Sequence, residues 1–383
     1  MSKPIFQALI MLPPRGHTRA ERWVAEGRGA AARDLARRLG RIPSVDQVWV
    51  LAADEFDRAA MEGAGARPFR GSGEPFHFGR ELANAAEAFD PAPVAYFGGG
   101  SAPLMTEDML AEAFERVSSA QEPMALVNNL HSTDWAIISH PHILHAYSHR
   151  FPQDNPLGWV LWKEASLRVE ALQPSAASRL DIDTPSDLIL ANGHPGLGLE
   201  LDAFLQGIER PWLKRVDRIR AIMASPGASL AIIGRASSNI WRELERRTEI
   251  WTRIFVEERG MVASGRLARG EVRSFVGRMV DDMGPEAFLA FFSELADGLI
   301  WDTRVWMASQ GVYPSPSDRF AADLGWVDEI EDPLLRRLAA AVEKAPMPAI
   351  VGGYGVVAGG LYALLETMDG DAAYHPSRNS RHS

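Results

Sequence analysis

The sequence of 383 residues contains no cysteine. This absence excludes a disulfide framework, a thiolate nucleophile and a zinc site built on thiolates. It suits a reducing compartment. The first ten residues include a short apolar run, but they lack the length and the cleavage region of a secretory signal. We therefore expect a cytoplasmic protein.

The chain also has no excess of basic residues. Its formal net charge is -10 and its pI is about 5.5. A general nucleic-acid binder needs a basic surface, so we expect no nucleic-acid partner. With 46% hydrophobic and 23% charged residues, the composition is that of a soluble globular protein long enough for two domains.

One segment, Ala345 to Leu365, has no charged residue and is long enough to cross a bilayer. Prolines and glycines dilute its hydrophobicity: Pro346, Pro348, Gly352, Gly353, Gly355, Gly359 and Gly360. A strand or turn followed by a tightly packed, glycine-rich helix fits this pattern better than a membrane span.

Apolar runs and helical segments alternate through the first half. Ile5 to Leu12 and Val45 to Ala53 read as strands, and Gly29 to Leu39 between them reads as a helix. The loop after the first run contains Arg15, Arg19 and Arg22, which could contact phosphates or could simply be solvated. Further segments follow the same alternation: residues 76–82 lead into an alanine-rich helix that ends near Phe89, strands are expected at 93–97 and 125–128, an apolar run follows at 136–138, and a helix is expected at 157–169.

Alternating strands and helices predict a mostly parallel sheet, whose ligands lie at the carboxyl ends of the strands. The glycine-rich turn at 98–101 follows a strand and belongs at that edge. Gly79 stands where a ligand could approach the backbone closely. The polar segment 129–135 could contact a substrate, but a hairpin connection is the favoured interpretation.

The segment from Leu180 to Leu188 carries the strongest pattern. A strand-like run presents Asp181 and Asp183 on one face, and Pro185 and Asp187 suit the first turn of a helix. Two carboxylates on one face repel each other unless a cation such as Mg²⁺ lies between them. The alternative leaves Asp183 as a helix cap and Asp181 as a salt-bridge partner.

Three segments in this order and spacing resemble one family: Leu12-Pro13-Pro14-Arg15-Gly16, Gly98-Gly99-Gly100-Ser101-Ala102-Pro103-Leu104 and Asp181-Ile182-Asp183-Thr184-Pro185-Ser186-Asp187-Leu188. Residues 1–195 are similar to nucleotidyltransferases of the molybdenum-cofactor and 2-phospholactate guanylyltransferase type. The resemblance implies a Rossmann-like, glycosyltransferase-A-like sheet and Mg²⁺-dependent (or Mn²⁺-dependent) nucleotidyl transfer from a nucleoside triphosphate to a small anionic metabolite.

The resemblance also implies roles for particular residues. Asp181 and Asp183 would bind the metal and take part in catalysis with Arg19. The nucleotide would contact residues from four places in the sequence: Leu12, Pro13, Arg15, Gly16, Gly79, Arg80, Gly99, Gly100 and Ser101.

The chain departs from the family in two places. Family members usually have an aspartate where this chain has Gly100-Ser101-Ala102, and a Gly-x-Gly with a downstream lysine where it has arginines. Two other functions therefore stay open: a glycosyltransferase that uses a sugar nucleotide, and a nucleotide-binding sensor or scaffold without catalysis.

His194 to Gly198 reads as a domain boundary. Beyond it we expect a mostly helical domain at 200–368 and a disordered tail at 369–383. The predicted helices are 201–208, 211–223, 240–257, 270–283, 285–309 and 333–344, interrupted by an apolar run at 230–233.

A second candidate site lies in this half. Asp302 falls on the apolar face of the predicted helix 285–309, where a charge is costly unless it is paired. It could converge with Arg235, Arg304 and the glycine turn at Gly353 to bind a polar substrate. A structural buried ion pair is the favoured alternative. The sequence leaves the oligomeric state open.

Overall fold

The computed structural model describes residues 4–73, 75–311 and 313–368, and the predicted tail at 369–383 lies outside them. The chain divides into two compact units. Among the described residues, the first comprises 4–15, 25–181 and 196–203, and the second comprises 16–24, 182–195 and 204–368. Relative to the predicted domains, residues 16–24 and 182–195 thus group with the second half.

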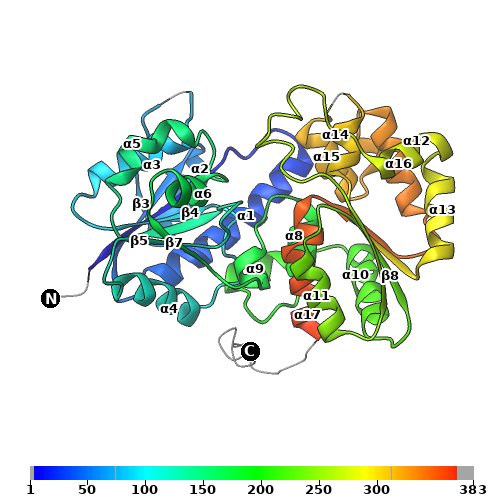
Figure 1. Cartoon of the computed structure of the whole chain (residues 1–383), viewed down its shortest axis with the longest axis horizontal. Coiled ribbons are helices and arrows are strands. Elements are labelled where there is room, and N and C mark those ends of the chain that lie inside the picture. Colours follow the sequence, from blue (N-terminus) through cyan, green and yellow to red (C-terminus); the bar gives the residue numbers. More distant parts are fainter. Residues whose placement is uncertain (1–3, 74, 312, 369–383) are drawn as a thin grey trace. The chain divides into compact units, whose positions relative to one another are not determined.

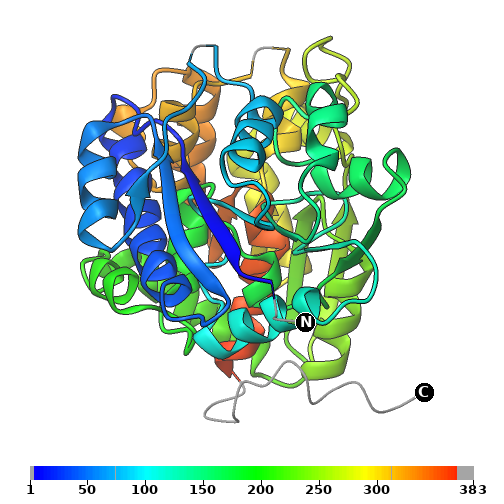
Figure 2. The same ribbon diagram turned by 90° about the vertical axis from the view of Figure 1, so that its left-hand side faces the viewer.

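The first unit contains a seven-stranded sheet with the strand order β3-β2-β1-β4-β6-β5-β7. Its strands are β1 (Phe6–Leu12), β2 (Val45–Ala52), β3 (Arg67–Pro68), β4 (Val94–Gly98), β5 (Met124–Val127), β6 (Trp135–Ile138) and β7 (Arg168–Ala171). Strand β1 pairs in parallel with both β2 and β4, and Figure 2 shows β1 and β2 side by side. Among the described strands of this sheet only β6 is antiparallel to its neighbours, so the predicted mostly parallel sheet is confirmed.

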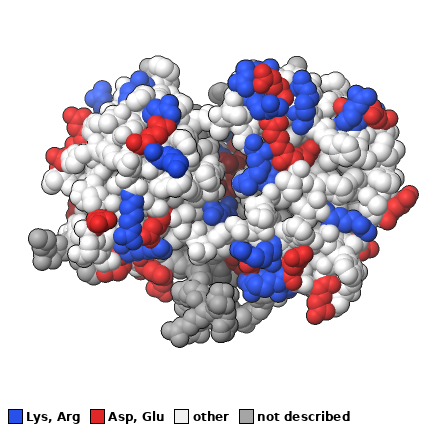
Figure 3. All heavy atoms as spheres, viewed as in Figure 1, with Lys and Arg blue, Asp and Glu red and all other residues white. Residues whose placement is uncertain are grey.

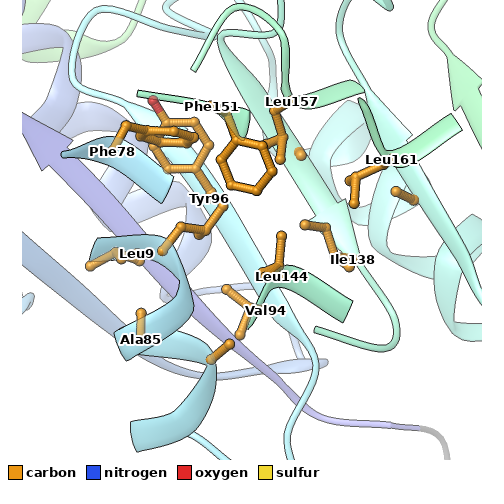
Figure 4. Packing of buried hydrophobic residues seen from close by; sticks show 14 of the residues in the cluster. Leu9, Phe78, Ala85, Val94, Tyr96, Ile138, Leu144, Phe151, Leu157 and Leu161 are labelled. Carbon is orange, nitrogen blue, oxygen red and sulfur yellow. The ribbon is translucent and has the colours of Figure 1, made fainter. Parts of the chain in front are cut away.

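Helices cover both faces of this sheet (Figure 1). They are α1 (Arg19–Leu39), α2 (Glu55–Gly63), α3 (Phe78–Ala88), α4 (Glu107–Ser118), α5 (Ile143–Tyr147), η1 (Ser148–Arg150), α6 (Leu157–Lys163) and α7 (Ala176–Arg179). Figure 4 shows side chains of α3, α5 and α6 packing on the apolar side chains of β1, β4 and β6. Alternation along β1 sends Phe6 to the other face, where its ring meets Phe114 of α4 at 5.1 Å.

The second unit contains a four-stranded parallel sheet with the order β11-β10-β8-β9. Its strands are β8 (Ser229–Gly234), β9 (Trp251–Val256), β10 (Gly298–Asp302) and β11 (Ala349–Gly352). Strands β8 and β10 are buried along nearly their whole length, as is usual for strands covered by helices on both faces.

Helix α9 (Leu199–Leu205) begins in the first unit. The helices of the second unit are α8 (Pro185–Ala191), α10 (Arg210–Met223), α11 (Ser238–Arg247), α12 (Phe275–Met283), α13 (Pro285–Leu295), α14 (Arg304–Ser309), α15 (Pro316–Asp323), η2 (Val327–Glu329), α16 (Pro333–Glu343), η3 (Tyr354–Val357) and α17 (Gly359–Met368). Phe288 of α13 packs on Trp301 with ring centroids 5.3 Å apart. Ile219 of α10 lies over Gly298 on the other face.

Helices thus dominate the regular structure of 200–368, as predicted, but they surround a sheet that the prediction did not include. The expected helix 285–309 is α13, β10 and α14, and the expected helix 240–257 is α11 followed by β9. Leu299, Ile300 and Trp301 form a short apolar run, which periodicity cannot distinguish from part of a buried helix. In the structure this run is buried between two layers of helices, and it forms a strand.

Two predictions for the first half need similar corrections. The expected helix 157–169 ends at Lys163, and Arg168–Ala171 pairs with β5 as strand β7. Helix α1 begins at Arg19, ten residues before its predicted start at Gly29. The first turns were not predicted because the charged residues between Arg19 and Gly29 interrupt the apolar stripe by which a helix is recognised.

The uncharged segment near the end of the chain forms β11, η3 and α17, as expected. Within the described residues, no helix combines the length and the apolar character that crossing a membrane requires.

The core under α3, α5 and α6 generates a stability prediction. Phe151 is fully buried there and its ring lies 6.2 Å from that of Phe78. Phe151→Ala should lower the free energy of unfolding by about 3–5 kcal/mol because it leaves a cavity. Ile5→Ala, an exposed apolar truncation in the same unit, should change it by no more than about 0.5 kcal/mol. Equal effects of the two variants in urea denaturation would contradict this core assignment.

Candidate functional site

The candidate site lies at the carboxyl edge of the first sheet, between β1 and β4. Strands β2 and β3 extend the sheet on one side of β1, whereas β4 begins the other side. The connection after β1 therefore runs to one side of the sheet and the connection after β4 to the other. In the β1/β4 pair, Met11 is opposite Gly98. Open α/β sheets hold their ligands in the crevice outside such a switch point.

The glycine-rich turn packs directly on the end of β1. A Cβ atom on Gly99 would lie 2.5 Å from Leu12 Cδ2 and 3.1 Å from the Met11 carbonyl oxygen. Any larger residue would push the turn away, so glycine is needed for this approach. The Ser101 hydroxyl donates to the Gly98 carbonyl at 2.8 Å and holds the turn closed.

A backbone bridge joins this turn to the aspartate motif. Ser101 and Asp181 form an isolated antiparallel pair, which is the part of the predicted strand at 180–183 that the structure contains. Asp181 is half-buried, Ile182 is buried and Asp183 is exposed, which agrees with the expected alternation. Three parts of the chain that are distant in sequence, the end of β1 at Leu12, the turn at 98–101 and Asp181, thus meet at the switch point.

The same edge contains carboxylates that the sequence analysis did not select. The Tyr96 hydroxyl donates to Asp154 Oδ2 at 2.8 Å, and the Asn128 amide donates to Asp134 Oδ2 at 2.7 Å. Burial raises the pKa of Tyr96 well above its usual value, and the charges of Asp154, Asp134 and Asp181 raise it further. All three carboxylates are therefore close to this phenol.

The position of Asp134 could have been found from the sequence. It immediately precedes β6, and β6 runs antiparallel to β4, so the start of β6 lies at the edge where β4 ends. The prediction treated segment 129–135 as a hairpin connection and missed this. Asp154 gave no comparable signal, because Asp-Asn-Pro is an ordinary turn sequence.

The arginines of the first loop contact residues of the protein itself. Arg15 Nη1 donates to Asp57 at 2.6 Å and its Nη2 to Glu26 at 3.5 Å, while its guanidinium lies 4.7 Å from the centre of the Phe56 ring. In the second unit, Arg19 pairs with Glu329 at 2.9 Å and lies over the ring of Trp326. On the face drawn in Figure 3, basic and acidic side chains are likewise interspersed.

The start of α1 binds a carboxylate of its own. The backbone N–H groups of His17 and Thr18 donate to Glu21 Oε2 at 3.1 and 3.0 Å. Burial raises the pKa of Glu21, but these hydrogen bonds outweigh it and lower the pKa overall. Gly16 has a φ of 77° and no room for a side chain beside Glu21. Glu21 therefore occupies the position that a phosphate would take at this helix end.

Gly79 and Arg80 likewise have contacts within the protein. The Gly79 N–H donates to the Phe151 carbonyl at 2.9 Å, and the Ser148 carbonyl closely approaches its Cα. The glycine thus permits packing of α3 against η1. Arg80 Nε donates to the Ser72 hydroxyl at 3.0 Å, and its Nη2 donates to the Pro75 carbonyl.

The second half of the aspartate motif starts a helix, as predicted, but Thr184 and not Asp183 is the N-cap residue. Asp187 Oδ2 accepts hydrogen bonds from the Thr184 N–H at 2.7 Å, the Thr184 hydroxyl at 2.8 Å and the Asp183 N–H at 3.2 Å. Its Oδ1 is buried without a hydrogen-bond partner. Burial raises the pKa of Asp187 to about 7, and the charge of Asp183 adds to this effect.

The second candidate set, Arg235, Asp302, Arg304 and Gly353, gathers around the carboxyl edge of the second sheet. Asp302 ends β10 and accepts from Arg235 Nε at 2.6 Å, and Arg304 Nη1 donates to Asp323 at 3.0 Å. Asp302 is therefore in a buried ion pair, as the favoured alternative predicted, and its partner is Arg235. Gly353 is different, because a side chain there would meet Thr184.

Metal binding at this edge depends on the carboxylates and histidines that could serve as donors. Within residues 4–73, 75–311 and 313–368, no three or more His, Asp or Glu side chains are grouped so that they could hold a metal ion. Mg²⁺ usually takes one or two carboxylates and completes its shell with water and substrate phosphates. A half-buried Asp181 and an exposed Asp183, one residue apart, fit this mode of binding.

Comparisons with known proteins found solved structures only. No family model and no curated protein matches the chain. A cytidylyltransferase from Leptospira borgpetersenii serovar Hardjo-bovis (strain JB197) is 17% identical with a TM-score of 0.38, over 49% of this chain and 85% of that chain.

Two further structures are similar over comparable lengths. A 4-diphosphocytidyl-2C-methyl-D-erythritol synthase from Anaerococcus prevotii DSM 20548 is 12% identical with a TM-score of 0.36, over 53% of this chain and 99% of that chain. A CMP:2-keto-3-deoxy-manno-octonic acid synthetase complexed with CTP is 12% identical with a TM-score of 0.31, over 43% and 89%. Similarity at this level does not assign a function to the chain.

The buried Asp187 generates a pH prediction. Its pKa is raised from 3.8 to about 7, so the folded protein holds the proton more tightly than the unfolded chain. Stability should therefore fall as the pH rises from about 4 to 7. Asp187→Asn removes this loss, and its stability relative to the parent should increase by up to about 4 kcal/mol between pH 4 and pH 8. Urea denaturation across this range measures the difference.

Asp328→Asn is the matched control, because it removes an exposed carboxylate from the same unit. Its stability relative to the parent should not change with pH in this way. If the Asp187→Asn difference were equally independent of pH, Asp187 would be ionised throughout the range and the prediction would be wrong.

Proposed function

We propose that the first unit binds a nucleoside triphosphate at the β1/β4 edge and transfers its nucleotidyl group to a small phosphorylated or carboxylated acceptor. The observation that carries the proposal is the convergence of the end of β1 at Leu12 and the turn at 98–101 with Asp181 at the switch point. Ligands of open α/β sheets bind at such a point. The three segments are also those that resemble guanylyltransferases in the sequence.

The reaction requires little from protein acids or bases. An oxygen of the acceptor attacks the α-phosphorus in line; the new O–P bond forms as the bond to the bridging oxygen breaks and pyrophosphate leaves. A phosphate or carboxylate oxygen is already deprotonated near neutral pH, so no proton must be removed. Positioning and neutralisation of charge supply most of the rate, and neither needs the missing cysteine.

The residues of the edge would have distinct roles. Gly99 lets the turn lie against β1, and the Ser101 backbone fixes the chain at Asp181. Asp181 and Asp183 would hold Mg²⁺ or Mn²⁺, which when bound neutralises phosphate charge and polarises the phosphoryl oxygen. Arg15 would contact phosphates only by leaving Asp57 and Glu26.

Nucleotide or sugar-nucleotide binding without nucleotidyl transfer is a second candidate. Two observations favour it. Gly100-Ser101-Ala102 stands where the family that the sequence resembles usually has an aspartate, and the guanidinium of Arg15 already has carboxylate partners. A protein of this kind would bind the nucleotide at the β1/β4 edge but would not release pyrophosphate from it.

The proposal predicts Mg²⁺-dependent stabilisation by one nucleoside triphosphate. Thermal unfolding would be measured with GTP, CTP, ATP, UTP and sugar nucleotides, each with and without Mg²⁺, because a ligand of the folded state raises the melting temperature. Asp181→Asn should weaken the Mg²⁺-dependent binding by at least about tenfold. Release of pyrophosphate in the presence of candidate acceptors would establish transfer.

Asp46→Asn is the control, because Asp46 is exposed near the start of β2, at the opposite edge of the sheet. It should bind the triphosphate as the parent does. Stabilisation without pyrophosphate release from any acceptor would favour the second candidate. Triphosphate binding that survives unchanged in Asp181→Asn would contradict a metal site at this motif.

A further inference from the structure

The second unit has a switch point of its own. In the order β11-β10-β8-β9, the chain passes from β8 to β9 on one side and later returns to β10 on the other. The crevice of this sheet therefore lies outside the carboxyl ends of β8 and β10. Those ends are Gly234 and Asp302.

Close packing of the backbone brings the charged side chain of Arg235 to the carboxyl ends of β8 and β10. Gly234 has a φ of 129°, and a Cβ atom there would lie 2.5 Å from Asp302 Cβ. The absent side chain lets the end of β8 pass directly over Asp302. Arg235, the next residue in the chain, therefore lies at the switch point.

Asp302 holds Arg235 in one orientation. Its Oδ2 accepts from Arg235 Nε at 2.6 Å and its Oδ1 from Arg235 Nη2 at 3.1 Å. Burial opposes the charge of Arg235, but the Asp302 carboxylate outweighs this and raises the pKa of the guanidinium. Asp302 is fully buried, whereas the Arg235 side chain keeps 18% of its surface exposed. The Nη1 group of Arg235 has no hydrogen-bond partner among the described residues.

A second arginine lies beside the first. The guanidinium of Arg235 is 5.3 Å from the centre of the Tyr354 ring, and Arg259 Nη2 is 3.5 Å from the Tyr354 hydroxyl. Arg259 is exposed and forms no ion pair with any described carboxylate. Tyr354 thus stands between two arginines, of which only Arg235 is neutralised.

The carboxyl of Glu257 is also near this edge, where it accepts a hydrogen bond from Ser274 and forms no ion pair with Arg235 or Arg259 among the described residues. It follows β9 at the same edge, its Oε1 accepts from the Ser274 hydroxyl at 2.6 Å, and its Oε2 is buried without a partner. Burial raises the pKa of Glu257, and the charge of Asp302 adds to this effect.

We propose that the carboxyl edge of β8 and β10 is a second ligand site, where Arg235 and Arg259 bind the phosphate group of a small molecule beside Tyr354. Arginine suits this role because its planar fork matches phosphate oxygens and its charge is permanent. Asp302 is a positioning residue that holds the fork of Arg235. The site lies wholly within the second unit and does not depend on the nucleotidyl transfer proposed for the first.

Isothermal titration of the full chain with inorganic phosphate and pyrophosphate tests the proposal, with citrate as a carboxylate probe. Arg259→Gln removes the unpaired arginine from an exposed position and should weaken phosphate binding by about tenfold, as expected for the loss of a charged hydrogen bond. Arg235→Lys keeps the charge but loses the fork, and it should weaken binding similarly. Arg242→Gln, an exposed arginine of α11, is the control and should bind as the parent does.

Because pyrophosphate could also bind at the first switch point, Asp181→Asn is titrated in parallel. Phosphate binding that persists in Asp181→Asn and falls in Arg259→Gln would support the second site, whatever the fate of the triphosphate site. No phosphate binding by the parent, equal binding by parent and Arg259→Gln, or a preference for citrate would overturn the proposal. If Arg235→Lys failed to fold, Arg259→Gln would still decide.

Discussion

Close approach of backbone to backbone at the carboxyl edge of a parallel sheet is the constraint on which both units depend. In the first unit Gly99 lies against the end of β1, and in the second Gly234 lies against Asp302. Side chains at either position would separate the two strand ends. The loops that follow can meet only because these contacts are made, so the candidate sites are consequences of the packing.

The two edges use charge differently. At the first edge the charges of three carboxylates, Asp134, Asp154 and Asp181, act on the buried phenol of Tyr96. Arg15 of the loop after β1 is paired with other carboxylates. The second neutralises Asp302 and Asp323 with Arg235 and Arg304 and leaves Arg259 in excess. An acidic edge suits a metal–phosphate complex, whereas an edge with surplus arginine suits a bare phosphate.

Local sequence signals predicted the elements whose pattern is short and unambiguous. The runs at 5–12 and 93–97 became β1 and β4, and the helix expected after Thr-Pro, with Asp187 in its first turn, became α8. Strand β10 was missed because Leu299, Ile300 and Trp301 suit a buried helix as well as a buried strand. The carboxylates Asp134 and Asp154 were missed because strand direction and pairing, which no local pattern encodes, bring them to Tyr96.

Hydrogen exchange measured with and without the triphosphate that binds, in the presence of Mg²⁺, tests the central claim most directly. If segments 12–15, 98–101 and 180–183 form one nucleotide site, their amides should gain protection together, while β8 to β11 change little. Protection of the second sheet alone, or of none of the three segments in a protein that binds the nucleotide, would contradict the account.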